Sequence, residues 1–227
     1  FTTWNGLGAP VPNGVDNFVE MMGDRYFWQS LGNTVFYMIG IPIGLVISLL
    51  LALALNRRMR GLTFFRTVYY VPVVSSLAAV AILWQWAYNG DFGLVNQVLS
   101  IFGIDGPNWL QNAATAKPAI IIMAVWKGIG YSMLLYLAAL QSVPSSMYEV
   151  AKIDGATAYE SFWKITFPMV SPLILTNVIY TIIDSFADSP VTERIYQTAF
   201  QSQNFGLSAA MAWLYTIAVS LLLVIIG

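Results

Sequence analysis

Cysteine and histidine are both absent from the 227 residues of this chain, and charged residues make up only 9% of it. Without cysteine the chain forms no disulfide and no thiolate metal site, and without histidine it lacks the commonest general base and the commonest zinc ligand. These absences argue against most hydrolytic and metal-dependent chemistry. The phosphate-binding pattern Gly-Xaa-Xaa-Xaa-Xaa-Gly-Lys-Ser/Thr is missing as well, so any nucleotide energy must come from another subunit.

The charge balance and the hydropathy point to a membrane. Ten lysines and arginines stand against eleven acidic residues, a net charge of −1 that offers no broad basic surface and argues against a nucleic-acid partner. Hydrophobic residues make up 58% of the chain and charged residues only 9%, whereas about 25% of the residues in soluble domains are charged. Because so few polar side chains remain to cover a water-facing surface, we expect the chain to lie in a lipid bilayer.

Long apolar runs predict an all-α integral membrane protein. A membrane-spanning helix needs roughly 20 mostly apolar residues, and about five runs approach that length. They are residues 32–55, 68–87, 118–140, 170–187 and 207–227. A further helix before Phe1 would bring the bundle to six. The predicted organisation is an extracytoplasmic segment over 1–31 and a transmembrane domain over 32–227.

The distribution of lysine and arginine predicts the orientation, because these residues are retained in cytoplasmic loops. Six cations occupy two loops on the same side of the predicted bundle: Arg57, Arg58, Arg60, Arg66, Lys152 and Lys164. Only Arg25, Lys117 and Arg194 lie on the other side, which places residues 1–31 outside and Gly227 at the inner face. The outer segment 88–117 is expected to hold turns around a short interfacial amphipathic helix.

The cytoplasmic loop 141–169 reads as two short helices. Ser146 and Glu149 have capping-box spacing, and Gly155 suits the left-handed position after a helix. Thr157 and Glu160 repeat the capping box, and Pro168 predicts the end of the second helix. A plain connection between helices needs only about 2–8 residues, so this longer ordered loop indicates a docking surface for a partner.

The same loop resembles a known motif. Glu149-Val150-Ala151-Lys152-Ile153-Asp154-Gly155, followed after nine residues by Ile165-Thr166-Phe167-Pro168, is similar to the EAA loop of prokaryotic ABC-importer permeases. Val150 and Phe167 depart from that pattern, both apolar for apolar. The flanking stretches extend the resemblance over nearly the whole chain, toward the carbohydrate-uptake branch of maltose and glycerol-phosphate type. They are Asn33-Thr34, residues 56–61, Phe64-Phe65-Arg66-Thr67, Val125-Trp126-Lys127 and residues 140–144.

The resemblance implies a type I importer fold in a prokaryotic inner (plasma) membrane. It implies a non-catalytic chain without a cofactor of its own, with ATP and Mg bound by partner ATPases. The implied partners are a second homologous permease, two ATPase subunits and an extracytoplasmic solute-binding protein that delivers a carbohydrate. The loop would then sit in a cleft of the ATPase, with Glu149, Ala151, Asp154 and Gly155 as its docking positions.

One departure from the family concerns the outer loop after Asp188. Members usually carry a longer stretch with Gly-Gly-Pro there, whereas Ser189-Pro190 here runs directly into Val191. Either the loop is short or residues are missing from the sequence, and the second explanation is favoured.

Polar residues within the predicted spans mark a candidate solute pathway. An ionised group in a span costs about 2.5–3.5 kcal/mol on insertion scales and normally faces a polar interior. Lys127 and Asp184 are predicted at membrane levels about 6 Å apart, which would allow an ion pair or a shared water cavity. Asn177, Tyr180 and Asp184 form a stripe on one helix face. The family resemblance favours Asp184, Ser185 and Phe186 at the solute site, while hydrogen bonding between helices is the structural alternative.

Other functions stay open at this point. The same machinery could carry a polyol, a glycerol-phosphate-like compound or an oligosaccharide. A secondary transporter would need coupling-ion sites at broken helices, for which only Lys127 and Asp184 are available among the predicted spans. An intramembrane enzyme would have to work with serine, aspartate and lysine alone, and no spacing here assembles such a site.

Overall fold

The computed structural model describes residues 1–57 and 60–226. The predictions that involve Arg58, Met59 and Gly227 therefore lie outside the described residues. The chain divides into two compact units, one formed by residues 1–38 with 179–227 and the other by residues 39–178. Each unit has a hydrophobic core of its own.

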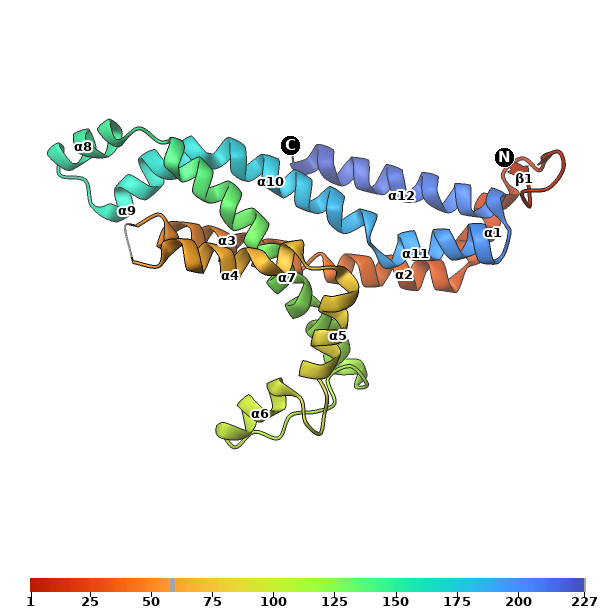
Figure 1. Ribbon diagram of the computed structural model, residues 1–227. Helices are drawn as coiled ribbons and strands as arrows, with labels where there is room; N and C mark the ends of the chain where they lie inside the picture. Colours follow the sequence, from red (N-terminus) through yellow and green to blue (C-terminus); the bar gives the residue numbers. More distant parts are fainter. Residues whose placement is uncertain (58–59, 227) are drawn as a thin grey trace. The chain divides into compact units, whose positions relative to one another are not determined.

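The unit of residues 39–178 is built around one long helix (Figure 1). Helix α7 (Ala113–Ser142) packs against α3 (Gly40–Leu55) and α4 (Leu62–Val74). The Ser48 hydroxyl of α3 donates to the Ile129 carbonyl of α7 at 3.1 Å, which ties the two helices at a buried position. The core of this unit gathers Ala52, Leu55, Met133, Tyr136, Leu137, Ala139, Leu140, Val143 and Val170.

The predicted span over 68–87 is not one straight helix. Helix α4 ends at Val74, α5 (Leu77–Ala87) follows, and the two are bent by 104°. Ser75 takes an extended conformation, and the Ser76 hydroxyl accepts from the Ala79 amide at 3.2 Å to cap α5. A continuous helix was therefore the wrong prediction for this segment.

A small lobe follows α5 in the segment predicted to lie outside, and its short helix is confirmed as α6 (Leu94–Ile101). Asn96 organises the lobe: its amide donates to the carbonyls of Gly90, Gly106 and Pro107 at 3.0–3.1 Å. Its side-chain oxygen accepts from the Trp109 indole at 2.7 Å. One side chain thus holds both ends of the lobe together.

The described part of the unit of residues 1–38 and 179–227 packs four helices together with the last residues of the helix over 167–187. They are α1 (Asp16–Gly23), α2 (Arg25–Tyr37), α11 (Pro190–Tyr196) and α12 (Phe205–Ile226), with the π-helical turn η2 (Gln197–Gln201) between the last two. Helix α11 contacts α2, and α1 contacts α12 (Figure 1). A short antiparallel pair, β1 (Thr2–Thr3) and β2 (Val11–Pro12), lies at the N-terminus. The core residues are Met21, Phe27, Val191, Leu207, Met211 and Tyr215.

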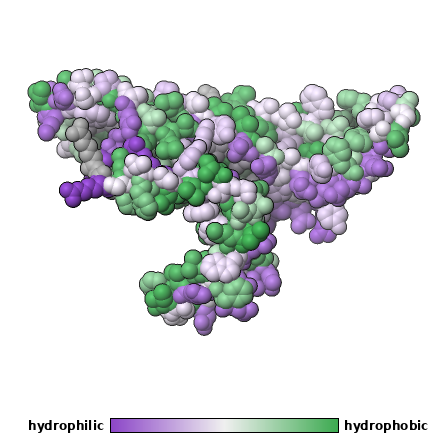
Figure 2. All heavy atoms as spheres, viewed as in Figure 1, coloured by the Kyte–Doolittle hydropathy of each residue, from purple (hydrophilic) through white to green (hydrophobic). Residues whose placement is uncertain are grey.

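Within the described residues, four helical stretches are long and apolar enough to cross a membrane, or five if the bent α4–α5 pair is one span. They are residues 25–55, 113–142, 158–201 and 205–226. The predicted all-α membrane fold is confirmed, although the stretch predicted at 170–187 belongs to a helical run that extends well beyond both ends. Figure 2 shows hydrophobic residues over much of the visible surface. Such a surface is stable against lipid tails rather than water.

Candidate functional site

The predicted cytoplasmic hairpin begins with α8 (Ser145–Ile153) and ends this helix with a Schellman motif. The Ala156 amide donates to the Ala151 carbonyl at 2.9 Å and the Gly155 amide donates to the Lys152 carbonyl at 3.2 Å. Gly155 has φ +76°, a conformation that glycine adopts without steric cost. The predicted role of Gly155 as the helix stop is therefore confirmed.

The start of α8 differs from the prediction. Pro144 is the N-cap residue and no side chain caps the helix, so the capping box of Ser146 and Glu149 is wrong. Pro144 is extended, with φ −60° and ψ 133°, and α8 starts directly after it, two residues earlier than a Ser146 cap predicts. This leaves Glu149 exposed and without a hydrogen-bond partner among the described residues.

The second half of the hairpin starts as predicted. Thr157 caps α9 (Ala158–Ser161): its hydroxyl accepts from the Glu160 amide at 3.2 Å, while the Glu160 carboxylate accepts from the Thr157 amide at 2.9 Å. Lys164 lies 3.3 Å from the same carboxylate. This capping box fixes the direction in which the chain leaves the turn at Gly155.

Pro168 does not end the helix. The π-helical turn η1 (Phe162–Thr166) follows α9 and leads without a loop into α10 (Phe167–Ala187). The Phe167 amide donates to the Phe162 carbonyl, a wider turn than in an α-helix. Proline in a regular helix collides with the carbonyl four residues earlier, and the wider turn relieves that contact. The predicted stop at Pro168 is thus wrong, and the hairpin is joined directly to the long helix.

A groove of about 420 Å³ runs between the two halves of the hairpin, and it lies within the unit 39–178. Its lining combines apolar and charged side chains: Met147, Val150, Ala151, Asp154, Gly155, Ala156, Glu160, Ser161, Lys164 and Ile165. Large apolar side chains around the groove are open, with Ile153 85% and Tyr159 73% exposed. The Tyr148 and Thr166 hydroxyls, 2.9 Å apart, hold α8 against η1.

The four predicted docking residues occupy different parts of this hairpin. Ala151, Asp154 and Gly155 line the groove, where Ala151 is buried and Asp154 is exposed. Glu149 lies on α8 outside the lining, also exposed. A glycine turn, a small alanine and two exposed carboxylates are suited to receive a partner surface that carries a cation.

The predicted pathway residues divide between the two units. Asn177 is 1% exposed, and its side-chain oxygen accepts from the Ser132 hydroxyl at 3.5 Å, which is the geometry of a contact between helices. Its amide nitrogen is buried with no hydrogen-bond partner in the described part of the chain. Lys127 is half-buried on α7 in the same unit, while Tyr180 belongs to the other unit and is 47% exposed.

The remaining pathway residues are at the end of α10. Asp184 and Ser185 are exposed, whereas Phe186 is half-buried and packs on Tyr215 with ring centroids 5.4 Å apart. The Tyr215 hydroxyl donates to the Phe186 carbonyl at 3.0 Å. Phe186 therefore has a packing role within its unit. Asp184 and Lys127 lie in different units, so their pairing stays a prediction.

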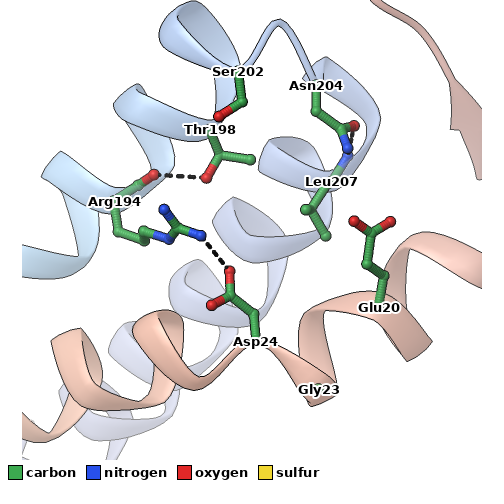
Figure 3. A pocket seen from close by; sticks show the side chains of 8 residues that line it. All are labelled: Glu20, Gly23, Asp24, Arg194, Thr198, Ser202, Asn204 and Leu207. Carbon is green, nitrogen blue, oxygen red and sulfur yellow. Dashed lines mark hydrogen bonds and ion pairs between the residues drawn. The ribbon is translucent and has the colours of Figure 1, made fainter.

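The sequence analysis missed a polar pocket in the unit of residues 1–38 and 179–227. The pocket has a volume of about 410 Å³ and is lined by Glu20, Gly23, Asp24, Arg194, Thr198, Ser202, Asn204 and Leu207 (Figure 3). Asp24 and Arg194 are 170 positions apart and meet at 2.7 Å between Oδ2 and Nη2. No local spacing links residues at such a separation. The only signal in the sequence was that Arg194 is one of the few cations on the side predicted to be outside.

The electrostatics of this pocket are set by the Asp24–Arg194 pair. Burial by itself raises the pKa of Asp24, but the hydrogen bond and charge of Arg194 and the amides of Phe27 and Tyr26 outweigh it, so the pKa lies below its ordinary value. The Tyr26 and Phe27 amides donate to Asp24 Oδ1 at 2.8 and 3.1 Å, as at the N-cap of a helix. Arg194 also lies over the Tyr26 ring, 5.4 Å from its centroid.

Comparison with known proteins identifies the family. The family described as the binding-protein-dependent transport system inner membrane component matches residues 40–227. The chain belongs to this family. The permease is 35% identical to the probable ABC transporter permease protein YesP of Bacillus subtilis, over all of this chain and 80% of the relative. It is 42% identical to the lactose transport system permease protein LacF of Rhizobium radiobacter, over 75% of this chain and 58% of that protein.

Solved structures share the fold. A bacterial ABC transporter involved in the import of the acidic polysaccharide alginate matches the permease with a TM-score of 0.82 at 24% identity, over 95% of this chain and 82% of that one. The resemblance to ABC-importer permeases noted from residues 149–168 is thereby confirmed. The named relatives are permease proteins of transport systems.

Proposed function

We propose that this permease translocates a carbohydrate that a solute-binding protein delivers, and that its hairpin over 145–166 couples this movement to a separate ATPase. The observation that carries the proposal is the hairpin itself, an ordered helix–turn–helix with an open groove and exposed apolar side chains. An exposed apolar surface of this kind in a polar rim marks a protein interface.

The carbohydrate cargo is supported by the relatives. Their names include lactose transport, transport of starch degradation products and sn-glycerol-3-phosphate transport. We infer the further partners from the family: a second permease, two ATPase copies that bind ATP and Mg, and the binding protein, in a prokaryotic inner membrane. A solved alginate importer is described in complex with a pentasaccharide-bound periplasmic protein.

A polyol, a glycerol-phosphate-like compound or an oligosaccharide is the alternative cargo, and an ion-coupled secondary transporter is the alternative mechanism. The cargo is decided by comparing uptake of a sugar, a polyol, glycerol phosphate and an oligosaccharide by the reconstituted purified complex, and the mechanism by measuring this uptake with and without ATP. ATP-dependent uptake supports the proposal, whereas uptake driven by an ion gradient without ATP contradicts it.

The coupling role is tested with charge and backbone substitutions in the hairpin. Glu149→Lys reverses an exposed charge that makes no bond in the described part of the chain, so the fold should tolerate it. Gly155→Asp forces a side chain onto φ +76° and adds a negative charge beside the groove. We expect both variants to insert in the membrane, and to lose ATP-driven uptake by more than about tenfold, which is roughly 1.4 kcal/mol of coupling.

A matched control separates coupling from backbone strain. Gly103 occupies the same Schellman position after α6, with φ +72° and the Ile104 amide bonded to the Leu99 carbonyl. No atom lies within 4 Å of a Cβ added at Gly103 or at Gly155. Gly103→Asp therefore carries about the same conformational cost, on the order of 1–2 kcal/mol. Equal loss of uptake in both glycine variants would assign the effect to folding and refute the coupling role.

We also propose Lys127, Asn177, Tyr180, Asp184, Ser185 and Phe186 as residues along the solute pathway. Asp184 and Ser185 are the exposed members at the end of α10, and Asn177 is the buried one. Asp184→Asn and Ser185→Ala should raise the sugar concentration for half-maximal uptake with little effect on complex yield. Phe186→Leu should instead lower thermal stability, because the ring packs on Tyr215.

A further inference from the structure

The pocket between α1, α11 and α12 brings hydrogen-bond donors and acceptors around one space. It lies wholly within the unit of residues 1–38 and 179–227, and none of the predicted pathway residues lines it. Figure 3 shows the Glu20 carboxylate and the Arg194 guanidinium pointing toward the same space from different helices. One is an acceptor and the other a donor, so a hydroxyl group satisfies both.

Arg194 has hydrogen-bonding capacity to spare. Among the described residues only its Nη2 is used, in the bond to Asp24, and its Nε is buried without a partner. The side chain is still 26% exposed. Tyr26 covers one face of the guanidinium and Asp24 holds one edge. The group is therefore fixed in place while some of its donors are available for a ligand.

The rest of the lining adds polar groups without adding charge. Thr198 is 2% exposed, and its hydroxyl donates to the Arg194 carbonyl at 2.9 Å, which fixes this side of the pocket. The Asn204 side-chain oxygen accepts from the Leu207 amide at 3.0 Å, leaving its NH₂ without a bond in the described part of the chain. Ser202 is exposed at the rim.

The charge balance selects among ligands. Asp24 and Arg194 neutralise each other, so Glu20, which makes no ion pair within the described residues, leaves the pocket with a net charge of −1. This charge repels a phosphate or a carboxylate. A neutral sugar pays no such penalty, because one of its hydroxyls can donate to Glu20 while another accepts from Arg194. A volume of about 410 Å³ leaves room for a sugar ring with water around it.

We propose that this pocket is an extracytoplasmic subsite for a neutral sugar, separate from the α10 residues of the pathway. The inference rests on the proposed function, because it takes the cargo to be a carbohydrate. It goes beyond it by naming a second place where the sugar binds and by favouring uncharged over phosphorylated sugars.

The test uses the absence of native cysteine. Ser202→Cys in the complete transporter in membrane vesicles is labelled with an impermeant maleimide added from outside. Glucose, lactose and maltose are added in turn as the neutral probes and sn-glycerol 3-phosphate as the anionic one. We expect at least one neutral sugar to slow labelling severalfold. To slow labelling as much, sn-glycerol 3-phosphate should need a concentration at least about tenfold higher.

Two further variants make the result specific. Glu20→Gln in the Ser202→Cys background should raise the half-protecting sugar concentration about tenfold, the usual loss for one hydrogen bond to a charged group. Glu193→Gln, an exposed residue of α11 outside the lining, should leave it unchanged. Ser100→Cys on α6 serves as an exposed control site that sugar does not protect.

The inference is overturned if no neutral sugar protects Ser202→Cys, if Ser100→Cys is protected equally, or if labelling occurs only from the cytoplasmic side. Protection by the binding protein alone, without sugar, would also overturn it and assign the pocket to protein docking. ATP-dependent sugar uptake measured on the same vesicles separates the two hypotheses. Uptake without protection refutes only the subsite, whereas loss of any ATP-dependent sugar uptake refutes the proposed function.

Discussion

Gly130 and Gly128 lie two residues apart on α7, and we expect them to respond in opposite directions to alanine. A Cβ at Gly130 would overlap the carbonyl oxygen of Tyr69 on α4 and would lie 3.0 Å from the Val73 side chain. A Cβ at Gly128 would meet no atom within 4 Å. The same substitution thus tests packing at one site and only helix propensity at the other.

The expected magnitudes follow from these contacts. Restoring ordinary contact distance at Gly130→Ala requires α4 to move from α7 by roughly 1 Å, and overpacking of this kind costs about 1–3 kcal/mol. Gly128→Ala should instead gain up to about 1 kcal/mol, because glycine is the poorer helix former. With about 2–4 °C per kcal/mol for a chain of this size, the two variants should differ by roughly 5–10 °C.

The assay is thermal unfolding of the purified transporter complex in detergent, with the two variants prepared in parallel. Gly130→Ala should unfold below the parent protein and Gly128→Ala at or above it. Equal melting temperatures for the two variants would refute the close approach of α4 to α7. A lower temperature for Gly128→Ala alone would refute it as well.

Three further predictions concern single polar contacts. Tyr88→Phe should destabilise the protein by about 1 kcal/mol in thermal unfolding, because the buried Ala119 carbonyl loses the hydroxyl that donates to it at 2.9 Å; an unchanged melting temperature would contradict this. Asn96→Ala should open the outer lobe and make it sensitive to protease added from outside, since four hydrogen bonds disappear at once; continued resistance would show that the lobe is held in another way. Asp24 has a lowered pKa in the folded protein, so its stabilisation is full above the ordinary pKa of about 3.9 and is lost as pH falls through the folded value. The melting temperature of Asp24→Asn should depend less on pH in that acidic range than that of the parent protein. An equal dependence in both proteins would contradict the lowered pKa of Asp24.

Local chemistry predicted the hairpin well. Gly155 and the Thr157–Glu160 capping box each act through bonds within five residues, which is the range that spacing alone can describe. The capping box at Ser146 failed because the extended Pro144 is the N-cap, so the helix starts two residues earlier. Pro168 failed for a related reason, since the π-helical turn before it makes room for the ring.

Contacts between segments that are distant in the chain could not be predicted from the sequence. Nothing near Gly130 distinguishes it from Gly128, and only the approach of α4 makes the first one sterically necessary. The Asp24–Arg194 pair likewise depends on two helices meeting across 170 positions. The composition predicted the membrane and the number of apolar runs, but the 104° bend at Ser75 and Ser76 replaced a straight span with two helices.

The join between the hairpin and α10 has a mechanical consequence. Because α9 continues through η1 into α10 with no intervening loop, there is no flexible segment that could absorb a displacement of the hairpin. A displacement at Thr157 must therefore tilt or rotate the first turns of α10. A few glycines inserted between residues 166 and 167 would make this junction flexible, so that movement of the hairpin would no longer be transmitted to α10.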